Sequence, residues 1–165
     1  MNDWFAQALA SYPRLAIAGG AKCGKTTISE RVADRPVVHG DDYMMLGWSE
    51  SSAKMAEVVN AIVGAVCVEG VQVPRALRKG MRVDAVVWLD SPRGKWDRGH
   101  RAMVDGAWTV LGEWRQANPR IAVIIPAPVP LRNALPQVLY AKQSEFAEPN
   151  EFAEPNEDDK KRARR

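Results

Sequence analysis

The fold is decided by the stretch Gly19-Gly20-Ala21-Lys22-Cys23-Gly24-Lys25-Thr26, which fits the pattern G-x-x-x-x-G-K-[ST] of the phosphate-binding loop called Walker A. An apolar run at 14–18 predicts a short buried strand before it. Ile28 and Val32, four residues apart, predict a helix over about 24–33 after it. In this order, backbone N–H groups and the positive end of the helix favour phosphate oxygens. The sequence therefore predicts a nucleoside triphosphate site.

The same motif predicts individual roles around a bound ATP. Lys25 is expected to reach the β- and γ-phosphates, and the Thr26 hydroxyl is expected to ligate Mg²⁺. The predicted nucleotide-binding set is Gly19, Gly20, Ala21, Lys22, Cys23, Gly24, Lys25, Thr26 and Thr27.

Composition indicates one globular domain. Of the 165 residues, 46% are apolar and 26% are charged. No apolar run approaches the ~20 residues of a membrane span, and the acidic N-terminus does not fit a secretion signal. Cys23 and Cys67 are expected to be free thiols, which suits a cytoplasmic location. His39 and His100 stand alone, without the spacing of a zinc site.

The chain divides into a domain over 1–142 and a tail over 143–165. The tail repeats Glu-Phe-Ala-Glu-Pro-Asn at 145–150 and 151–156, is too polar to form a core, and is predicted to be disordered. Its basic end either touches a nucleic acid backbone or only solubilises the chain. The domain holds 18 of the 23 bases and 13 of the 20 acids, which suits a phosphate-bearing ligand, ATP alone included.

Hydrophobic patterns predict alternating strands and helices, and hence a parallel sheet with helices on both faces. In such sheets ligands bind beyond the carboxyl ends of the strands. Ser49 is a plausible cap for the third helix. The predicted strands are 14–18, 35–39, 65–68, 83–89 and 121–125, and the predicted helices are 2–12, 24–33, 48–62, 74–79, one ending near 116, and a last short one over 131–141.

Acidic residues follow two of these strands. Asp41 and Asp42 follow the second, where either could accept a hydroxyl proton or hold a magnesium-bound water, and Asp42 could instead cap the next turn. Glu69 follows the third and could support Mg²⁺, orient an acceptor, or be a solvated strand-end acid. Arg75 and Arg78 come next and could bind an anionic acceptor.

A basic stretch at 93–101 follows the fourth strand. Arg98 and Arg101 would share one helix face and could neutralise a transferring phosphate as part of a lid, or form a solvated face. Trp48 and Trp96 flank predicted loops and could stack on a base. The basic stretch contains Arg93, Lys95, Arg98 and Arg101.

Taken in order, these motifs resemble the P-loop kinases of nucleosides and nucleotides, such as uridine and nicotinamide riboside kinases. The resemblance covers residues 13 to about 125 and rests on the glycine loop, Asp41-Asp42-Tyr43, Glu69-Gly70 and the arginines at 93–101. It implies a three-layer P-loop NTPase sandwich, with a five-stranded parallel sheet and the loop strand in the middle. It also implies Asp41 as the catalytic base, with Asp42 as the alternative.

A narrower resemblance connects Trp48-Ser-Glu and the segment 69–79 with small phage P-loop proteins that accompany DNA base hypermodification. Some of these are 5-hydroxymethyluracil DNA kinases, which implies a base in DNA as the acceptor. The chain departs from that picture in having no separate DNA-binding module.

Three functions follow from these motifs. The favoured one is an ATP- and Mg²⁺-dependent kinase acting on a hydroxyl of a nucleobase, nucleoside or nucleotide. A nucleotide-hydrolysing switch or motor is the second, although the chain lacks the Asn-Lys-x-Asp run that specifies guanine. A non-catalytic nucleotide-binding module is the third.

Overall fold

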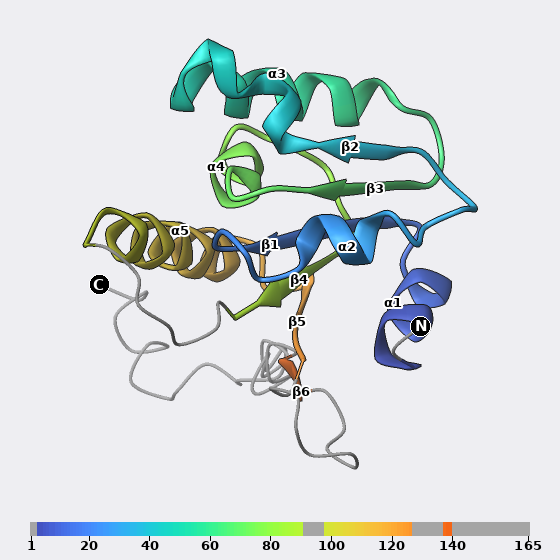
Figure 1. Ribbon diagram of the computed structural model, residues 1–165. Helices are drawn as coiled ribbons and strands as arrows, with labels where there is room; N and C mark the ends of the chain where they lie inside the picture. The colour runs from blue at the N-terminus through green and yellow to red at the C-terminus, as the bar shows by residue number, and fades with distance from the viewer. Residues whose placement is uncertain (1–2, 91–97, 127–136, 140–165) are drawn as a thin grey trace, which may run out of the picture.

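The computed structural model describes residues 3–90, 98–126 and 137–139 (Figure 1). The expected alternation of strands and helices is confirmed. The predicted tail at 143–165, together with Arg93, Lys95 and Trp96, lies outside the described residues. In chain order the elements are α1 (Asp3–Ser11), β1 (Arg14–Gly19), α2 (Lys25–Ser29), β2 (Val37–His39), the 3₁₀ helix η1 (Gly40–Leu46), α3 (Trp48–Ala61), β3 (Val66–Glu69), α4 (Val73–Arg78), β4 (Ala85–Leu89), α5 (Arg98–Ala117), β5 (Ala122–Ile125) and β6 (Gln137–Leu139).

The strands form one sheet in the order β2-β3-β1-β4-β5-β6. The first five are parallel, and β1 lies in the middle of them, as predicted. The expected helix over 131–141 is wrong at 137–139, because these residues form β6, which pairs antiparallel with β5. Pro136 stands directly before β6, and proline disfavours helix both at its own position and at the residue before it.

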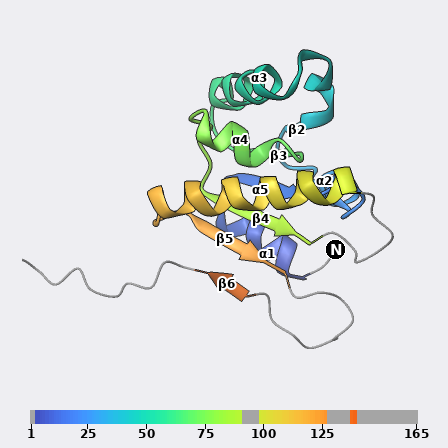
Figure 2. The same cartoon turned by 90° about the vertical axis from the view of Figure 1, so that its left-hand side faces the viewer.

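Helices cover both faces of the sheet and enclose two apolar layers (Figures 1 and 2). Side chains alternate along each strand, so that in β1 Leu15 and Ile17 enter one layer while Ala16 and Ala18 enter the other. Helices α1 and α2 contribute to the first layer, and α3, α4 and α5 contribute to the second. Strands buried on both faces are typical of parallel sheets.

Both cysteines of the chain are free, as predicted. Cys67 is buried within β3, and this burial raises the pKa of its thiol to about 12, so the thiol stays protonated at neutral pH. Cys23 lies half-buried in the glycine loop. Within the described residues, no helix is both long enough and apolar enough to cross a membrane.

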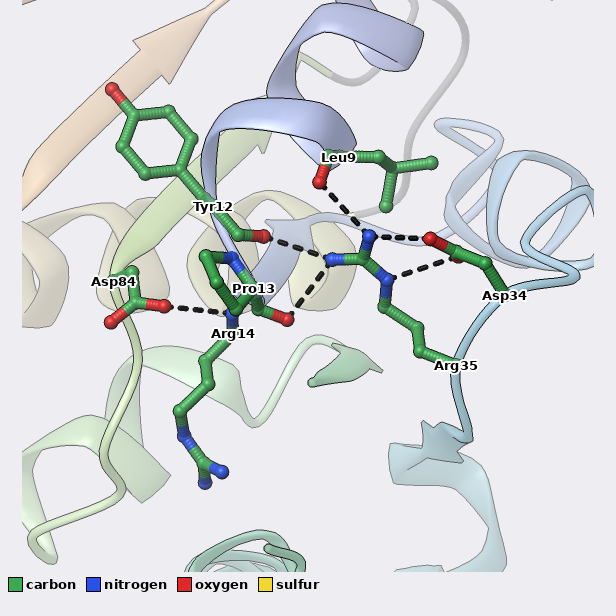
Figure 3. Close-up of polar contacts among 7 residues, drawn as sticks. All are labelled: Leu9, Tyr12, Pro13, Arg14, Asp34, Arg35 and Asp84. Atoms are coloured by element: carbon green, nitrogen blue, oxygen red, sulfur yellow. Dashed lines mark hydrogen bonds and ion pairs between the residues drawn. The ribbon is translucent and has the colours of Figure 1, made fainter. Parts of the chain in front are cut away.

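Two arginines close the end of the sheet where the parallel strands begin (Figure 3). The Arg35 guanidinium donates to the backbone carbonyls of Leu9, Tyr12 and Pro13 at 2.9–3.0 Å and pairs with Asp34 at 2.6 Å. These bonds tie the end of α1 to the chain entering β2. In the same way, the Arg14 guanidinium donates at 2.8–3.1 Å to carbonyls at the end of α3 and beyond it, namely those of Val59, Ile62, Gly64 and Arg82.

The segment after β2 differs from the expected loop at 40–43, because residues Gly40–Leu46 form η1. It packs closely on α3 and on the β3–α4 turn, since a Cβ on Gly40 would lie 2.7 Å from the methyl group of Met55 in α3 and 2.8 Å from the amide oxygen of Gln72 in the turn. Ser49 was expected to cap α3 but does not. The helix begins at Trp48, and its N-cap is Gly47 at φ 76°, a conformation that favours glycine.

Candidate functional site

The glycine loop joins the end of β1 to the start of α2 at the carboxyl edge of the sheet (Figure 1). Three of its residues have positive φ: Gly19 at 146°, Lys22 at 56° and Gly24 at 89°. A Cβ on Gly19 would collide with the carbonyl oxygen of Leu89, so only glycine lets the loop leave β1 this close to β4. The loop backbone is therefore tightly curled.

Helix α2 is shorter than the predicted 24–33 and ends at Ser29. Beyond it the N–H groups of Arg31 and Val32 bond to carbonyls three residues back, which is the tighter spacing of a helix that is ending. The buried Ser29 hydroxyl bonds to the Thr26 carbonyl. A five-residue helix aligns few peptide dipoles, so any anion here must depend mainly on the loop and on Lys25.

Lys25 folds back across the loop from the first position of α2. Its Nζ donates to the carbonyl oxygen of Gly20 at 2.6 Å and lies 3.6 Å from the Cys23 sulfur. The Cys23 thiol in turn donates to the same Gly20 carbonyl at 3.0 Å. These contacts hold the lysine ammonium group directly over the curled backbone.

A buried carboxylate lies beside the loop. Glu69, the last residue of β3, is only 2% exposed, and its Oε1 accepts a hydrogen bond from the Thr26 hydroxyl at 3.3 Å. The same oxygen lies 3.0 Å from Nδ1 of His39, whose backbone is paired with that of Glu69 in the sheet register. Polar partners of this kind offset the cost of burying a carboxylate. The alternative that Glu69 is a solvated acid at the end of a strand is therefore wrong.

In the sequence His39 lies apart from any zinc-type cluster, but in the structure it contacts Glu69. His39 and Glu69 each end a strand, and residues that end neighbouring parallel strands lie side by side. The sequence showed both residues at strand ends but did not show that β2 and β3 are neighbours. With that strand order, the contact would have been predictable.

A cavity of about 430 Å³ opens at this edge of the sheet and brings several predicted site residues together. Lys25 and Thr26 share it with Asp41 and Glu69, although these residues come from three separate segments of the chain. Trp48 and His100 also contribute. The full lining is Ala21, Lys22, Gly24, Lys25, Thr26, Thr27, Asp41, Met44, Trp48, Glu69, Val71, His100 and Met103.

Other predicted site residues lie elsewhere. Asp42 is exposed and is not among the residues that line this cavity. The two neighbouring aspartates therefore differ, because only Asp41 lines the cavity. Arg98 and Arg101 are exposed in the first turn of α5 and do not line it either, whereas His100 between them does. Sequence reasoning left His100 without a role.

A second cavity, of about 510 Å³, contains the other two predicted arginines, Arg75 and Arg78. Trp48 lines both cavities. The guanidinium carbon of Arg75 lies 5.0 Å from the centre of the Trp48 ring, a cation–π contact. The lining is Trp48, Ser49, Ser52, Arg75, Arg78 and Lys79.

Metal binding at the first cavity would depend on oxygen ligands. Among the described residues, no group of three or more histidine, cysteine or carboxylate side chains is placed to hold a metal ion. Thr26 and Glu69 do supply a hydroxyl and a carboxylate 3.3 Å apart. That donor set suits Mg²⁺, which usually takes one or two protein oxygens and completes its shell with phosphates and water.

Comparison with known proteins identifies no family for the chain. No family model matches it, and no curated protein matches it. A function is therefore assigned from the sequence motifs together with the α/β architecture, the strand order and the two cavities.

Proposed function

We propose that this protein is an ATP-dependent kinase that transfers the γ-phosphate to a hydroxyl group of a nucleobase- or nucleoside-type acceptor. The observation that carries the proposal is the first cavity. In it, Lys25 and Thr26 from the glycine loop share one space with the carboxylates of Asp41 and Glu69. The Lys25 cation and the backbone amides of the glycine loop suit a phosphate donor. The carboxylate of Asp41, which comes from η1, suits a hydroxyl acceptor.

The donor half of the site is the glycine loop with its Walker A pattern. The backbone N–H groups of residues 20–26 hold the phosphates, and the Lys25 ammonium group offsets the charge of the β- and γ-phosphates. When bound, Mg²⁺ supplies positive charge that offsets the charge developing on the transferred group. Thr26 and Glu69 are the residues that would hold it, Glu69 directly or through water.

The acceptor half of the site centres on Asp41. Its carboxylate takes the proton of the acceptor hydroxyl as the oxygen forms a bond to the γ-phosphorus. The bond from that phosphorus to the β,γ-bridging oxygen breaks, and ADP leaves. Asp42 is the alternative base. Arg98 and Arg101 do not line the cavity and would have to turn toward it to stabilise the transferring phosphate, whereas His100 between them already lines it.

The favoured acceptor is 5-hydroxymethyluracil within DNA, and free nucleosides and nucleotides are the alternatives. Support comes from the resemblance of Trp48-Ser-Glu and 69–79 to small phage P-loop proteins, and from the net positive charge of residues 1–142. The hydroxymethyl group of this base is an alcohol of the kind that such a site would phosphorylate.

The test is phosphate transfer from radiolabelled ATP to a panel of acceptors. The panel contains hydroxymethyluracil DNA, unmodified DNA, nucleosides and nucleotides, and Lys25→Ala is the matched inactive control. We expect label in at least one acceptor with the native chain and none with Lys25→Ala. Release of phosphate to water alone would favour a switch or motor. ATP binding without any turnover would favour a binding module, and either outcome overturns the kinase.

A further inference from the structure

The second cavity has the chemistry of an anion site. Its wall brings together three cationic side chains, Arg75, Arg78 and Lys79, from the end of α4. No acidic residue is among the described residues that line it. Three positive charges around a single cavity of about 510 Å³ favour a ligand with negative charge.

Among the described residues, neighbouring groups leave most of this charge uncompensated. Arg75 rests on the Trp48 ring, and the Lys79 ammonium group donates to the Ser49 hydroxyl at 3.3 Å, so both have neutral partners there. Arg78 pairs with Glu113 of α5 at 3.5 Å, and both side chains are more than half exposed. Exposed pairs of this kind contribute little, so a phosphate could compete with Glu113 for Arg78.

The start of α3 adds to the same field. This helix has 14 residues, begins at Trp48 with no side-chain hydrogen bond at its cap, and contributes Trp48 and Ser49 to the cavity lining. The first N–H groups of a helix point outward from its N-terminus and favour anions. Glu50 in this turn carries the opposite charge, but it does not line the cavity.

Trp48 links this cavity to the proposed kinase site, because its side chain lines both. We propose that the second cavity binds a phosphate ester of the acceptor, so that the acceptor is a nucleotide or a nucleic acid strand rather than a free nucleoside. The inference rests on the proposed function, since it places the acceptor hydroxyl in the first cavity, which Asp41 lines. The acceptor phosphate then lies in the second cavity, beside Arg75, Arg78 and Lys79.

The test measures binding without ATP, so that it does not depend on turnover. Fluorescence anisotropy of a labelled single-stranded oligothymidylate is measured for the native full-length chain, Arg75→Gln, Lys79→Gln and Arg120→Gln. Arg120→Gln is the matched control, because it removes the same charge from an exposed residue just before β5, at the opposite end of the sheet. The basic residues at 160–165 are present in every variant, so differences between variants do not come from them.

We expect Arg75→Gln and Lys79→Gln each to weaken binding about tenfold, as for the loss of one charge-assisted hydrogen bond. Each should also lower the salt dependence by about 0.7 in the slope of log affinity against log salt. Arg120→Gln should change neither quantity by as much. Thymidine monophosphate should compete for the probe and thymidine should not. Competition by the monophosphate identifies a single nucleotide as sufficient, and competition only by unlabelled strand identifies nucleic acid.

Equal weakening by all three variants, or displacement of the probe by thymidine at the same concentration as by its monophosphate, would overturn the inference. This failure is distinct from failure of the kinase proposal. A chain that phosphorylates acceptors but binds them without the three cations refutes only the second cavity. A chain that binds thymidine monophosphate through Arg75 and Lys79 but transfers no phosphate refutes the kinase and retains the anion site.

Discussion

The two ends of the parallel strands use charge in opposite ways. At the end where strands begin, Arg14 and Arg35 donate to backbone carbonyls of α1, α3 and the connecting segments. At the end where strands finish, Glu69 bonds to side chains, and Lys25 and Asp41 line a cavity of about 430 Å³. The charged groups at the first end bond to backbone carbonyls of the chain, whereas those at the second end line a cavity. The comparison predicts that substitutions at the first end affect stability and those at the second affect activity.

The largest effect is expected at the cavity end. Asp41→Asn should lower phosphate transfer by about 10²–10⁴-fold, because an amide cannot take the hydroxyl proton. ATP affinity and the midpoint of urea unfolding should stay close to native, since Asp41 is exposed. Asp42→Asn is the matched control, because the two residues differ in whether they line the cavity. If Asp42→Asn is the inactive variant and Asp41→Asn is active, the roles of the two aspartates are reversed.

The next effect is expected at the opposite end. Arg35→Met should lower the free energy of unfolding by about 2–4 kcal/mol, because it removes the donor to the carbonyls of Leu9, Tyr12 and Pro13. The folded fraction should keep native turnover. Arg31→Met, at an exposed neighbour on the same segment, should change stability by no more than about 0.5 kcal/mol. Urea denaturation measures both, and equal effects would contradict the special role of Arg35.

A smaller effect on activity is expected at Glu69. Glu69→Gln keeps the shape but removes the charge that holds Thr26 and His39. Turnover should fall about 10–100-fold, as for supporting residues of metal sites, and the Mg²⁺ concentration for half-maximal activity should rise. His39→Gln is the comparison variant, because it removes only the other partner of Glu69. An unchanged Mg²⁺ requirement in Glu69→Gln would show that Glu69 supports the fold and not the metal.

The smallest effect concerns pH. The hydrogen bond from Arg35 holds the pKa of the exposed Asp34 carboxyl below its ordinary value of 3.8. A carboxyl group whose pKa is lowered in the folded state stabilises the fold when the pH is above its unfolded-state pKa. This contribution disappears as the pH falls below 3.8 toward the folded-state pKa. Asp34→Asn should therefore lose less stability than the native chain between pH 5 and pH 3. Parallel pH curves for the two chains would contradict the prediction.

Much of the framework could be predicted from the sequence, because the relevant signals are local. The glycine pattern and the apolar runs marked the five parallel strands, and strands linked by helices imply a parallel sheet. What could not be predicted depends on contacts between distant segments. The Glu69–His39 pair needs the order of β2 and β3, and the structural roles of Arg14 and Arg35 need the positions of carbonyls more than 20 residues away.

Local misreadings have local causes. Ser49 has the right residue type for a cap, but Gly47 can adopt the required positive φ, and the helix therefore begins at Trp48. The 131–141 segment contains apolar residues at helical spacing, but Pro136 interrupts it and 137–139 pair with β5. In both cases, the backbone preferences of a nearby glycine or proline determined the local structure, against the preference of the neighbouring side chains.

The antiparallel β6 has a consequence for solubility. A parallel sheet that ended at β5 would present a row of unpaired N–H and C=O groups along Ala122–Ile125, a template on which strands from other molecules can assemble. Pairing of Gln137–Leu139 with Val123–Ile125 occupies that row with the chain's own backbone. At the opposite edge, β2 offers only three residues. Among the described residues, the sheet thus ends at both edges in a three-residue strand, β2 or β6, and short edge strands offer few unpaired groups to other chains.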